Sequence, residues 1–240
     1  MKLEKEIYAY LNDELFDSGL RLRIGERQRS LVDRITFIVD NVKNKKVIHV
    51  GCLDHIPLID QKIKKKVWLH KRIDEVALKQ VGIDINEEGL KVVRKKGYPN
   101  VYYEDIVSNQ PPGDFISSDS WDTMVLGEIL EHVNNPVEFL QNVHRKYSNH
   151  VAEILITVPN AFALENFLHV LKNKEFINSD HRAWFSIYTL AKNLTISGFA
   201  KIEFEYVTSY ADDYRRNFIW RYFLNRFPAL RSTIVMRASF

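Results

Sequence analysis

The sequence has little of what defines several classes of protein. Its 240 residues include a single cysteine, Cys52, which excludes an intramolecular disulfide framework and a cysteine-based zinc cluster. The formal net charge is only +3, without the concentrated basic stripe of a nucleic-acid surface. No apolar run has the length of a membrane span, and the N-terminal residues lack the apolar core of a signal peptide. We therefore expect a soluble cytoplasmic protein with no nucleic-acid partner and no stable membrane insertion.

Glycines and clustered metal ligands are also scarce. Of the nine glycines only Gly51 lies in the loop after the first apolar run, so the glycine fingerprint of nicotinamide-dependent dehydrogenases is missing. His132, His144, His150 and Asp180 show no recognisable ligand spacing on one helix or turn. The sequence therefore predicts no metal site.

The chain does contain short apolar runs that alternate with helical patterns. Five runs are typical of buried strands, and they end at Gly51, Asp84, Asp105, Gly127 and Pro159. Two further strands are expected near residues 201–207 and 233–237, and helices over 68–79, 86–97, 137–147, 161–172 and 187–196. This alternation predicts βαβ units, and therefore a doubly wound α/β fold whose helices cover both faces of a mostly parallel sheet.

Two of these strands end on acidic residues, at the edge where open α/β sheets bind ligands. Asp84 can accept two hydrogen bonds from ribose hydroxyls, or it can equally cap the helix that follows. Asp105 can accept from an adenine amino group, or it can be a simple turn residue. The residues by themselves leave both pairs of alternatives open.

Six segments between Lys45 and Phe199 carry a resemblance to a known family. In chain order they read VIHVGC, VGIDINEEGL, NVYYEDI, WDTMVLGEILEHVNNPVEFL, ILITVPN and DHRAWFSIYTLAKNLTISGF. With these segments the sequence resembles the class I S-adenosylmethionine (SAM)-dependent methyltransferases, and GEILEHVNNP is the most specific stretch. The last segment is similar to that of members acting on small molecules and bacterial glycans.

The resemblance implies a Rossmann-like fold with a mostly parallel seven-stranded sheet, and SAM as the cofactor. It implies that Asp84 holds the ribose and that Asp105 and Ile106 bind the adenine. It also implies that Leu126 and Gly127, at the end of the fourth strand, contact the methionine portion through backbone groups. The implied cofactor-binding residues are Gly51, Asp84, Ile85, Asp105, Ile106, Leu126 and Gly127.

The loop after the first strand departs from the family pattern. The family usually has several glycines there, whereas Gly51 is followed by Cys52 and Leu53. Leu53 stands where a glycine normally allows the cofactor to approach the backbone. The loop is either reshaped and still able to bind SAM, which we expect because the other segments match, or it has lost the cofactor.

Two histidines are candidates for the base that a hydroxyl acceptor needs, because imidazole titrates near neutral pH. His132 follows the fourth strand, and His181 lies in the loop after the fifth. Each has an equally weighted structural alternative, His132 as a residue bonded to backbone at the start of a helix and His181 as a loop anchor. Glu131 is expected to orient or cap rather than to react.

The two ends of the chain carry weaker predictions. Residues 1–44 are interpreted as an N-terminal helical lid over the cofactor, and residues 45–240 as the methyltransferase domain. The lid contains Arg21, Arg23, Arg27 and Arg29. Residues 214–231 mix arginines, among them Arg215 and Arg216, with aromatic residues. They form either a surface helix that touches a membrane or a lipid-linked acceptor, or, as we favour, a connector whose aromatic side chains cover the sheet.

We therefore predict a SAM-dependent O-methyltransferase that acts on a sugar, a glycan precursor or another small polar metabolite. Two alternatives stay open. The enzyme could methylate nitrogen or carbon instead of oxygen, or the chain could be a methyltransferase-like binding or scaffold protein without turnover.

Overall fold

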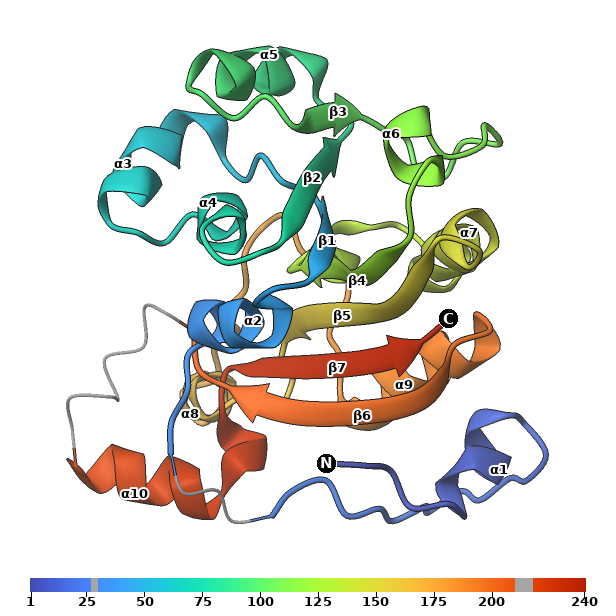
Figure 1. Cartoon of the computed structure of the whole chain (residues 1–240). Helices are drawn as coiled ribbons and strands as arrows, with labels where there is room; N and C mark the ends of the chain where they lie inside the picture. The colour runs from blue at the N-terminus through green and yellow to red at the C-terminus, as the bar shows by residue number, and fades with distance from the viewer. Residues whose placement is uncertain (27–29, 210–217) are drawn as a thin grey trace.

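The chain folds around one seven-stranded sheet with helices on both faces (Figure 1). The computed structural model describes residues 1–26, 30–209 and 218–240. The strands are β1 (Lys46–Val50), β2 (Lys79–Asp84), β3 (Val101–Tyr103), β4 (Trp121–Gly127), β5 (Val151–Pro159), β6 (Ala200–Val207) and β7 (Thr233–Ser239). The α-helices are α1 (Ile7–Leu11), α2 (Arg34–Val42), α3 (Ile59–Lys64), α4 (Leu69–Asp74), α5 (Glu87–Lys95), α6 (Asp114–Ser117), α7 (Pro136–Tyr147), α8 (Leu164–Val170), α9 (Ile187–Ile196) and α10 (Phe218–Arg226). Short 3₁₀ turns are η1 (Ile56–Leu58), η2 (Leu130–His132) and η4 (Pro228–Leu230).

The strand order is β3-β2-β1-β4-β5-β7-β6. Strands β1 to β5 pair in parallel, whereas β7 runs antiparallel to both β5 and β6. This confirms the predicted doubly wound, mostly parallel sheet of seven strands. The order reverses between β1 and β4, and such a switch point opens a crevice at the carboxyl ends of the strands.

The core consists of two layers because successive residues of a strand point to opposite faces of the sheet. On one face Val47 and Val125 pack with Ile38 of α2 and Ile73 of α4. On the other face Ile48 belongs to the cluster that α7 and α9 complete. Figure 1 shows these helix pairs on opposite sides of the sheet. Both faces being covered explains why the strands read as continuous apolar runs.

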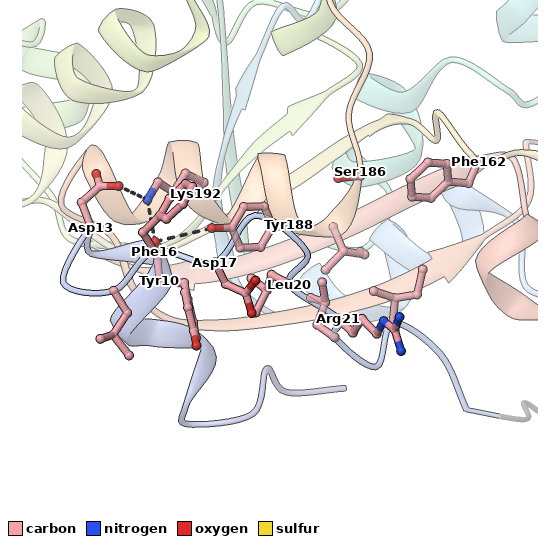
Figure 2. A pocket seen from close by; sticks show the side chains of 14 residues that line it. Tyr10, Asp13, Phe16, Asp17, Leu20, Arg21, Phe162, Ser186, Tyr188 and Lys192 are labelled. Carbon is pink, nitrogen blue, oxygen red and sulfur yellow. Dashed lines mark hydrogen bonds and ion pairs between the residues drawn. The ribbon is translucent and has the colours of Figure 1, made fainter.

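The N-terminal segment is less helical than expected and lies at the β6 edge of the sheet. Between α1 and α2 none of the described residues is helical. The backbone N–H of Phe204 donates to the carbonyl of Met1 at 2.8 Å, and Lys192 of α9 donates to the carbonyl of Tyr10. The segment and α9 border a cavity of about 630 Å³, beside which Lys192 also contacts Asp13 (Figure 2). Arg27 and Arg29 of the proposed lid lie outside the described residues.

The C-terminal helix α10 differs from the interpretation we favoured. Its side chains Phe218 and Tyr222 are 81% and 60% exposed, and Leu224 is its buried residue. The expectation that the aromatic residues of this helix cover the sheet is therefore wrong for these two. Arg215 and Arg216 lie outside the described residues. Within the described ranges, no helix has the length and apolar character that crossing a membrane requires.

Candidate active site

A cavity of about 580 Å³ lies at the carboxyl ends of β1, β2 and β3 and reaches the turn after β4. It is lined by five of the residues implied to bind the cofactor: Gly51, Asp84, Ile85, Asp105 and Ile106. These residues come from three separate strand ends, which the strand order places next to one another. The structure therefore brings together, in one cavity, acids that the sequence could only place at the ends of strands.

The remaining two implied residues lie elsewhere. Leu126 is fully buried in the core, and a side-chain carbon added at Gly127 would meet Leu69 and Arg34 rather than the cavity. Neither residue lines the cavity. After β4 the cavity wall includes Ile129, which follows Glu128 in its left-handed conformation with φ 61°.

Gly51 occupies a position that favours glycine. Its φ is +67°, in the left-handed region that disfavours a side chain, and an added Cβ would lie 2.3 Å from Cδ1 of Ile129. The backbone N–H of Gly51 donates to the carbonyl of Ile83 at 2.9 Å, which ties the loop to β2. The chain therefore borders the cavity with bare backbone at this point.

Asp84 holds the turn between β2 and α5 and does not itself cap the helix. Its Oδ1 accepts from the N–H of Asn86 at 3.0 Å, and its Oδ2 accepts from the N–H of Leu53 at 3.4 Å. The helix cap is Asn86, whose side chain accepts from the N–H of Gly89. Burial raises the pKa of Asp84 above its usual value. Since a carboxylate has about four acceptor positions, these backbone contacts do not use all of them, and Asp84 also lines the cavity.

Asp105 is both a turn residue and a residue of the cavity wall, so its two interpretations are not exclusive. Its Oδ1 accepts from the N–H of Val107 at 3.0 Å. Its carbonyl accepts from Nζ of Lys146 at 2.8 Å, and Lys146 forms a buried ion pair with Glu104 at 2.9 Å. These contacts fix the end of β3, so that Asp105 is held in place before any ligand binds.

Leu53 does not fill the cavity. It is 2% exposed and belongs to a buried cluster with Trp68 and Leu90. An added Cβ at Gly89 would lie 2.6 Å from Cδ1 of Leu53, so the leucine packs against the bare backbone of α5. The cavity lining does not include Leu53. The glycine-poor loop is thus reshaped, with its extra side chain directed into the core.

A second cavity, of about 460 Å³, lies beyond the turn after β4 and the end of β5. Its wall combines the aromatic residues Trp184 and Phe176 with polar residues, among them Asn160 and Thr233. Asn160 is almost fully buried, and its amide donates to two carbonyls of the segment before β7. The loop 178–185 separates this cavity from the first, because Arg182 lines the first cavity and neighbouring residues of the loop line the second.

His132 and His181 lie on the boundary of the two cavities. Their ring centroids are 4.8 Å apart and the rings meet edge to face. His132 lines the first cavity, and His181 lines the second. Nδ1 of His132 lies 3.3 Å from the carbonyl oxygen of Asp180, which tethers the ring to the loop. Burial and the neighbouring His132 lower the pKa of His181.

Glu131 is the residue of this site whose importance the sequence did not reveal. Its side chain is fully buried, and neither carboxylate oxygen has a hydrogen-bond partner among the described residues. Burial, and then the charge of Glu128, raise the pKa of Glu131 to about 8. Its carbonyl accepts from the N–H of Arg182 at 2.7 Å, which joins η2 to the loop 178–185. Its position between two cavity-lining histidines comes from this long-range contact, which no local pattern contains.

Comparison with known proteins identifies the fold class. No protein-family model and no curated protein sequence matches the chain. A solved SAM-dependent methyltransferase from Archaeoglobus fulgidus is 17% identical with a TM-score of 0.51, covering 86% of this chain and 91% of that chain. The small RNA methyltransferase HEN1 is 16% identical with a TM-score of 0.54, covering 92% of this chain but 27% of that chain.

A third structure points the same way. A SAM-dependent methyltransferase from Thermotoga maritima, described as a possible histamine N-methyltransferase, is 12% identical with a TM-score of 0.51, covering 84% of each chain. At such identities the likeness establishes the fold alone. The chain has the Rossmann-like fold of the class I SAM-dependent methyltransferases, as the resemblance in its sequence implied.

Proposed function

We propose that this chain transfers a methyl group from SAM to a hydroxyl group of a sugar or another small polar acceptor. The observation that supports this most is the position of His132 and His181 between two adjoining cavities, the first of which carries acids suited to a nucleoside. A donor and an acceptor bound in these cavities would meet at the two imidazoles.

The first cavity fits SAM in size and in polar groups. Its volume of about 580 Å³ falls within the range of roughly 300 to 1,000 Å³ of small-molecule sites. Asp84 would accept from the ribose hydroxyls, and Asp105 from the adenine amino group, beside Ile106. Gly51 would let the backbone approach the amino-acid end. We assign Ile129 to the cofactor in place of Leu126 and Gly127, because Ile129 lines the cavity.

The chemistry leaves three tasks for the chain. Bound SAM supplies a methyl group that its positively charged sulfur has already activated. The protein has to orient the acceptor, exclude water and accept the proton that a hydroxyl loses. His132 and His181 suit the last task, because an imidazole can take up a proton near neutral pH.

The second cavity supports a polar acceptor of sugar type. Trp184 and Phe176 offer flat apolar faces, and the same wall contains polar residues, among them Thr233. A sugar ring presents apolar and hydroxyl surfaces of this kind. Since HEN1 is named a small RNA methyltransferase, and RNA carries ribose hydroxyls, short RNA belongs in the acceptor panel beside free sugars and nucleotide-linked sugars.

Calorimetric titration with SAM tests the cofactor assignment directly. We expect a dissociation constant in the micromolar range and a higher melting temperature in the presence of SAM, because a ligand that binds only the folded state stabilises it. Absence of binding at millimolar SAM would refute the proposal. A scaffold protein without turnover would show no SAM-dependent methylation of any acceptor in the panel.

Substitution of the two histidines tests whether the acceptor atom is a hydroxyl oxygen. A variant carrying His132→Gln and His181→Gln should lose most turnover on a hydroxyl acceptor while still binding SAM, because only proton removal is affected. Undiminished turnover in this variant would favour a nitrogen or carbon acceptor. Cytoplasmic localisation stays a prediction, which fluorescence microscopy of the tagged chain would test.

A further inference from the structure

The side chains of Glu131, His132 and His181 lie close enough together to hold a metal ion. Each residue offers one ligand atom, and the three atoms lie within 4.8 Å of one another. Two of the residues come from η2 and one from the loop before α9, 49 positions further along the chain. Tertiary structure alone creates this arrangement, which is why the sequence predicted no metal ligands at this place.

The buried carboxylate of Glu131 is the first observation that indicates an ion. Its side chain has no exposed surface, and neither oxygen has a hydrogen-bond partner within the described part of the chain. A buried polar group without a partner is costly, and buried charges are normally paired or bound to a metal. No lysine or arginine side chain forms an ion pair with Glu131 among the described residues. A cation among these three side chains would supply the missing partner.

The two imidazoles are the second observation. Nδ1 of His132 lies 3.3 Å from the carbonyl oxygen of Asp180. A proton on that nitrogen leaves the lone pair of Nε2 available, and metal-binding histidines commonly donate their other ring N–H to a backbone carbonyl in this way. Nδ1 of His181 is buried and has no hydrogen-bond partner in the described part of the chain. Each ring therefore has a nitrogen for which the described residues provide no hydrogen bond.

We propose that Glu131, His132 and His181 bind a divalent transition-metal ion such as Zn²⁺ at the boundary of the two cavities. Two imidazoles and one carboxylate are a ligand set of catalytic zinc sites, which keep a further position open for water or substrate. In the tetrahedral geometry of zinc, ligand atoms bound at about 2.1 Å lie roughly 3.4 Å apart. Side-chain rotations that shorten the longest separation by roughly 1.4 Å would therefore close the site around the ion.

The role of such an ion rests on the proposed function, whereas its binding does not. With His132 on the first cavity and His181 on the second, the open position would face the acceptor. A hydroxyl oxygen bound to the metal loses its proton to water or to a nearby base more easily, because the metal stabilises the alkoxide. With the ion bound, the two histidines would activate the hydroxyl as metal ligands and would not accept its proton themselves, and the double variant would lose turnover in either role.

The test is a calorimetric titration of the chelator-treated full chain with Zn²⁺, in the absence of SAM, which measures the affinity for the ion. We expect one equivalent to bind in the micromolar range or tighter. Co²⁺ should bind to the same place with a visible absorption spectrum that reports coordination by nitrogen and oxygen. Glu131→Gln and His181→Gln should each weaken Zn²⁺ binding at least tenfold, because each removes one metal ligand. The side chain that replaces it has a similar shape and volume.

Matched controls are Glu175→Gln and His150→Gln, which change the same residue types outside both cavities and should bind Zn²⁺ like the unaltered chain. Circular dichroism and SAM affinity establish that each variant is folded. Absence of Zn²⁺ and Co²⁺ binding at millimolar concentration, or equal binding by the ligand variants and the controls, would overturn the metal site. Failure to bind SAM would defeat the proposed function and leave a measured metal site intact, so the two failures are distinguishable.

Discussion

The molecule contains two histidine pairs, one inside the fold and one at the boundary of two cavities, and their surroundings suit different roles. His49 and His70 stack with centroids 5.5 Å apart inside the fold, where Gln80 contacts Nδ1 of His70 at 2.9 Å. His132 and His181 are similarly close to each other, but they line cavities. In the first pair Nδ1 of each ring has a partner, whereas the second pair adjoins a carboxylate that has no hydrogen-bond partner among the described residues.

The comparison teaches that proximity of two imidazoles does not by itself indicate function. Burial lowers the pKa of both His49 and His70, so the inner pair stays neutral and acts as packing. The outer pair keeps nitrogen atoms accessible to a ligand. Four predictions test this contrast, in order of decreasing expected effect.

The largest effect is expected for the double variant His132→Gln and His181→Gln. Turnover should fall about 10²- to 10⁴-fold, the usual contribution of acid–base catalysis, while the melting temperature changes little. The measurement is initial rate at saturating SAM together with a thermal melt. A large drop in melting temperature with proportionate loss of activity would place this pair in the same structural class as the inner one.

The inner pair should instead affect stability through pH. The pKa of His70 falls from 6.5 to about 4 on folding, so the unfolded chain binds more protons between these values. The contribution of His70 to the free energy of unfolding is therefore fully present above pH 6.5. It is lost as the pH falls toward 4, and it amounts to at most about 3 kcal/mol. Denaturant unfolding at pH 7.5 and pH 4.5 measures this. The variant His70→Gln should show a smaller difference between the two pH values, and an equal difference would contradict the assignment.

Asp84→Ala should weaken SAM binding without disturbing either histidine pair. We expect about a 10- to 100-fold loss of affinity, because hydrogen bonds to a charged group contribute about 1.5 to 3 kcal/mol. Calorimetry with SAM provides the measurement. The matched control is Asp60→Ala, an exposed aspartate outside the cavity; equal losses in the two variants would remove Asp84 from the cofactor site.

The smallest effect is expected for His150→Gln. His150 lies outside both cavities, and its backbone forms hydrogen bonds with Trp121 and Tyr147. A substitution of this kind normally changes the free energy of unfolding by no more than about 0.5 kcal/mol. A change in the free energy of unfolding above about 1 kcal/mol, or any loss of methylation, would contradict our inference that a histidine outside the cavities has no functional role.

The fold was largely predictable because its signals are local. The helix expected at 187–196 is α9 as observed, and the strand expected at 121–127 is β4. The helix expected over 68–79 is wrong in its second half, since α4 ends at Asp74. There the chain turns, and the N–H of Asn44 donates to the carbonyl of Val76. That contact joins residues 32 positions apart, so helical periodicity could not report it.

The candidate site was predictable only in part. Strand ends identified Asp84 and Asp105, because parallel strands bring their carboxyl ends to one edge. The family resemblance also pointed to backbone contacts of Leu126 and Gly127 with the cofactor, which stay a prediction, since neither residue is part of the cavity lining. The lid over residues 1–44 stays a prediction, since none of the described residues in that range lines the first cavity.

The amino-acid sequence by itself determined the order of strands and helices, the two-sided core and the acids at the strand ends. These features follow from the spacing of apolar residues and from chain direction, which act over a few positions. Only the tertiary structure decided where Leu53 points, that Glu131 is buried without a partner, and that His181 meets His132. Such outcomes depend on which distant segments pack together, and packing leaves no local pattern in the chain.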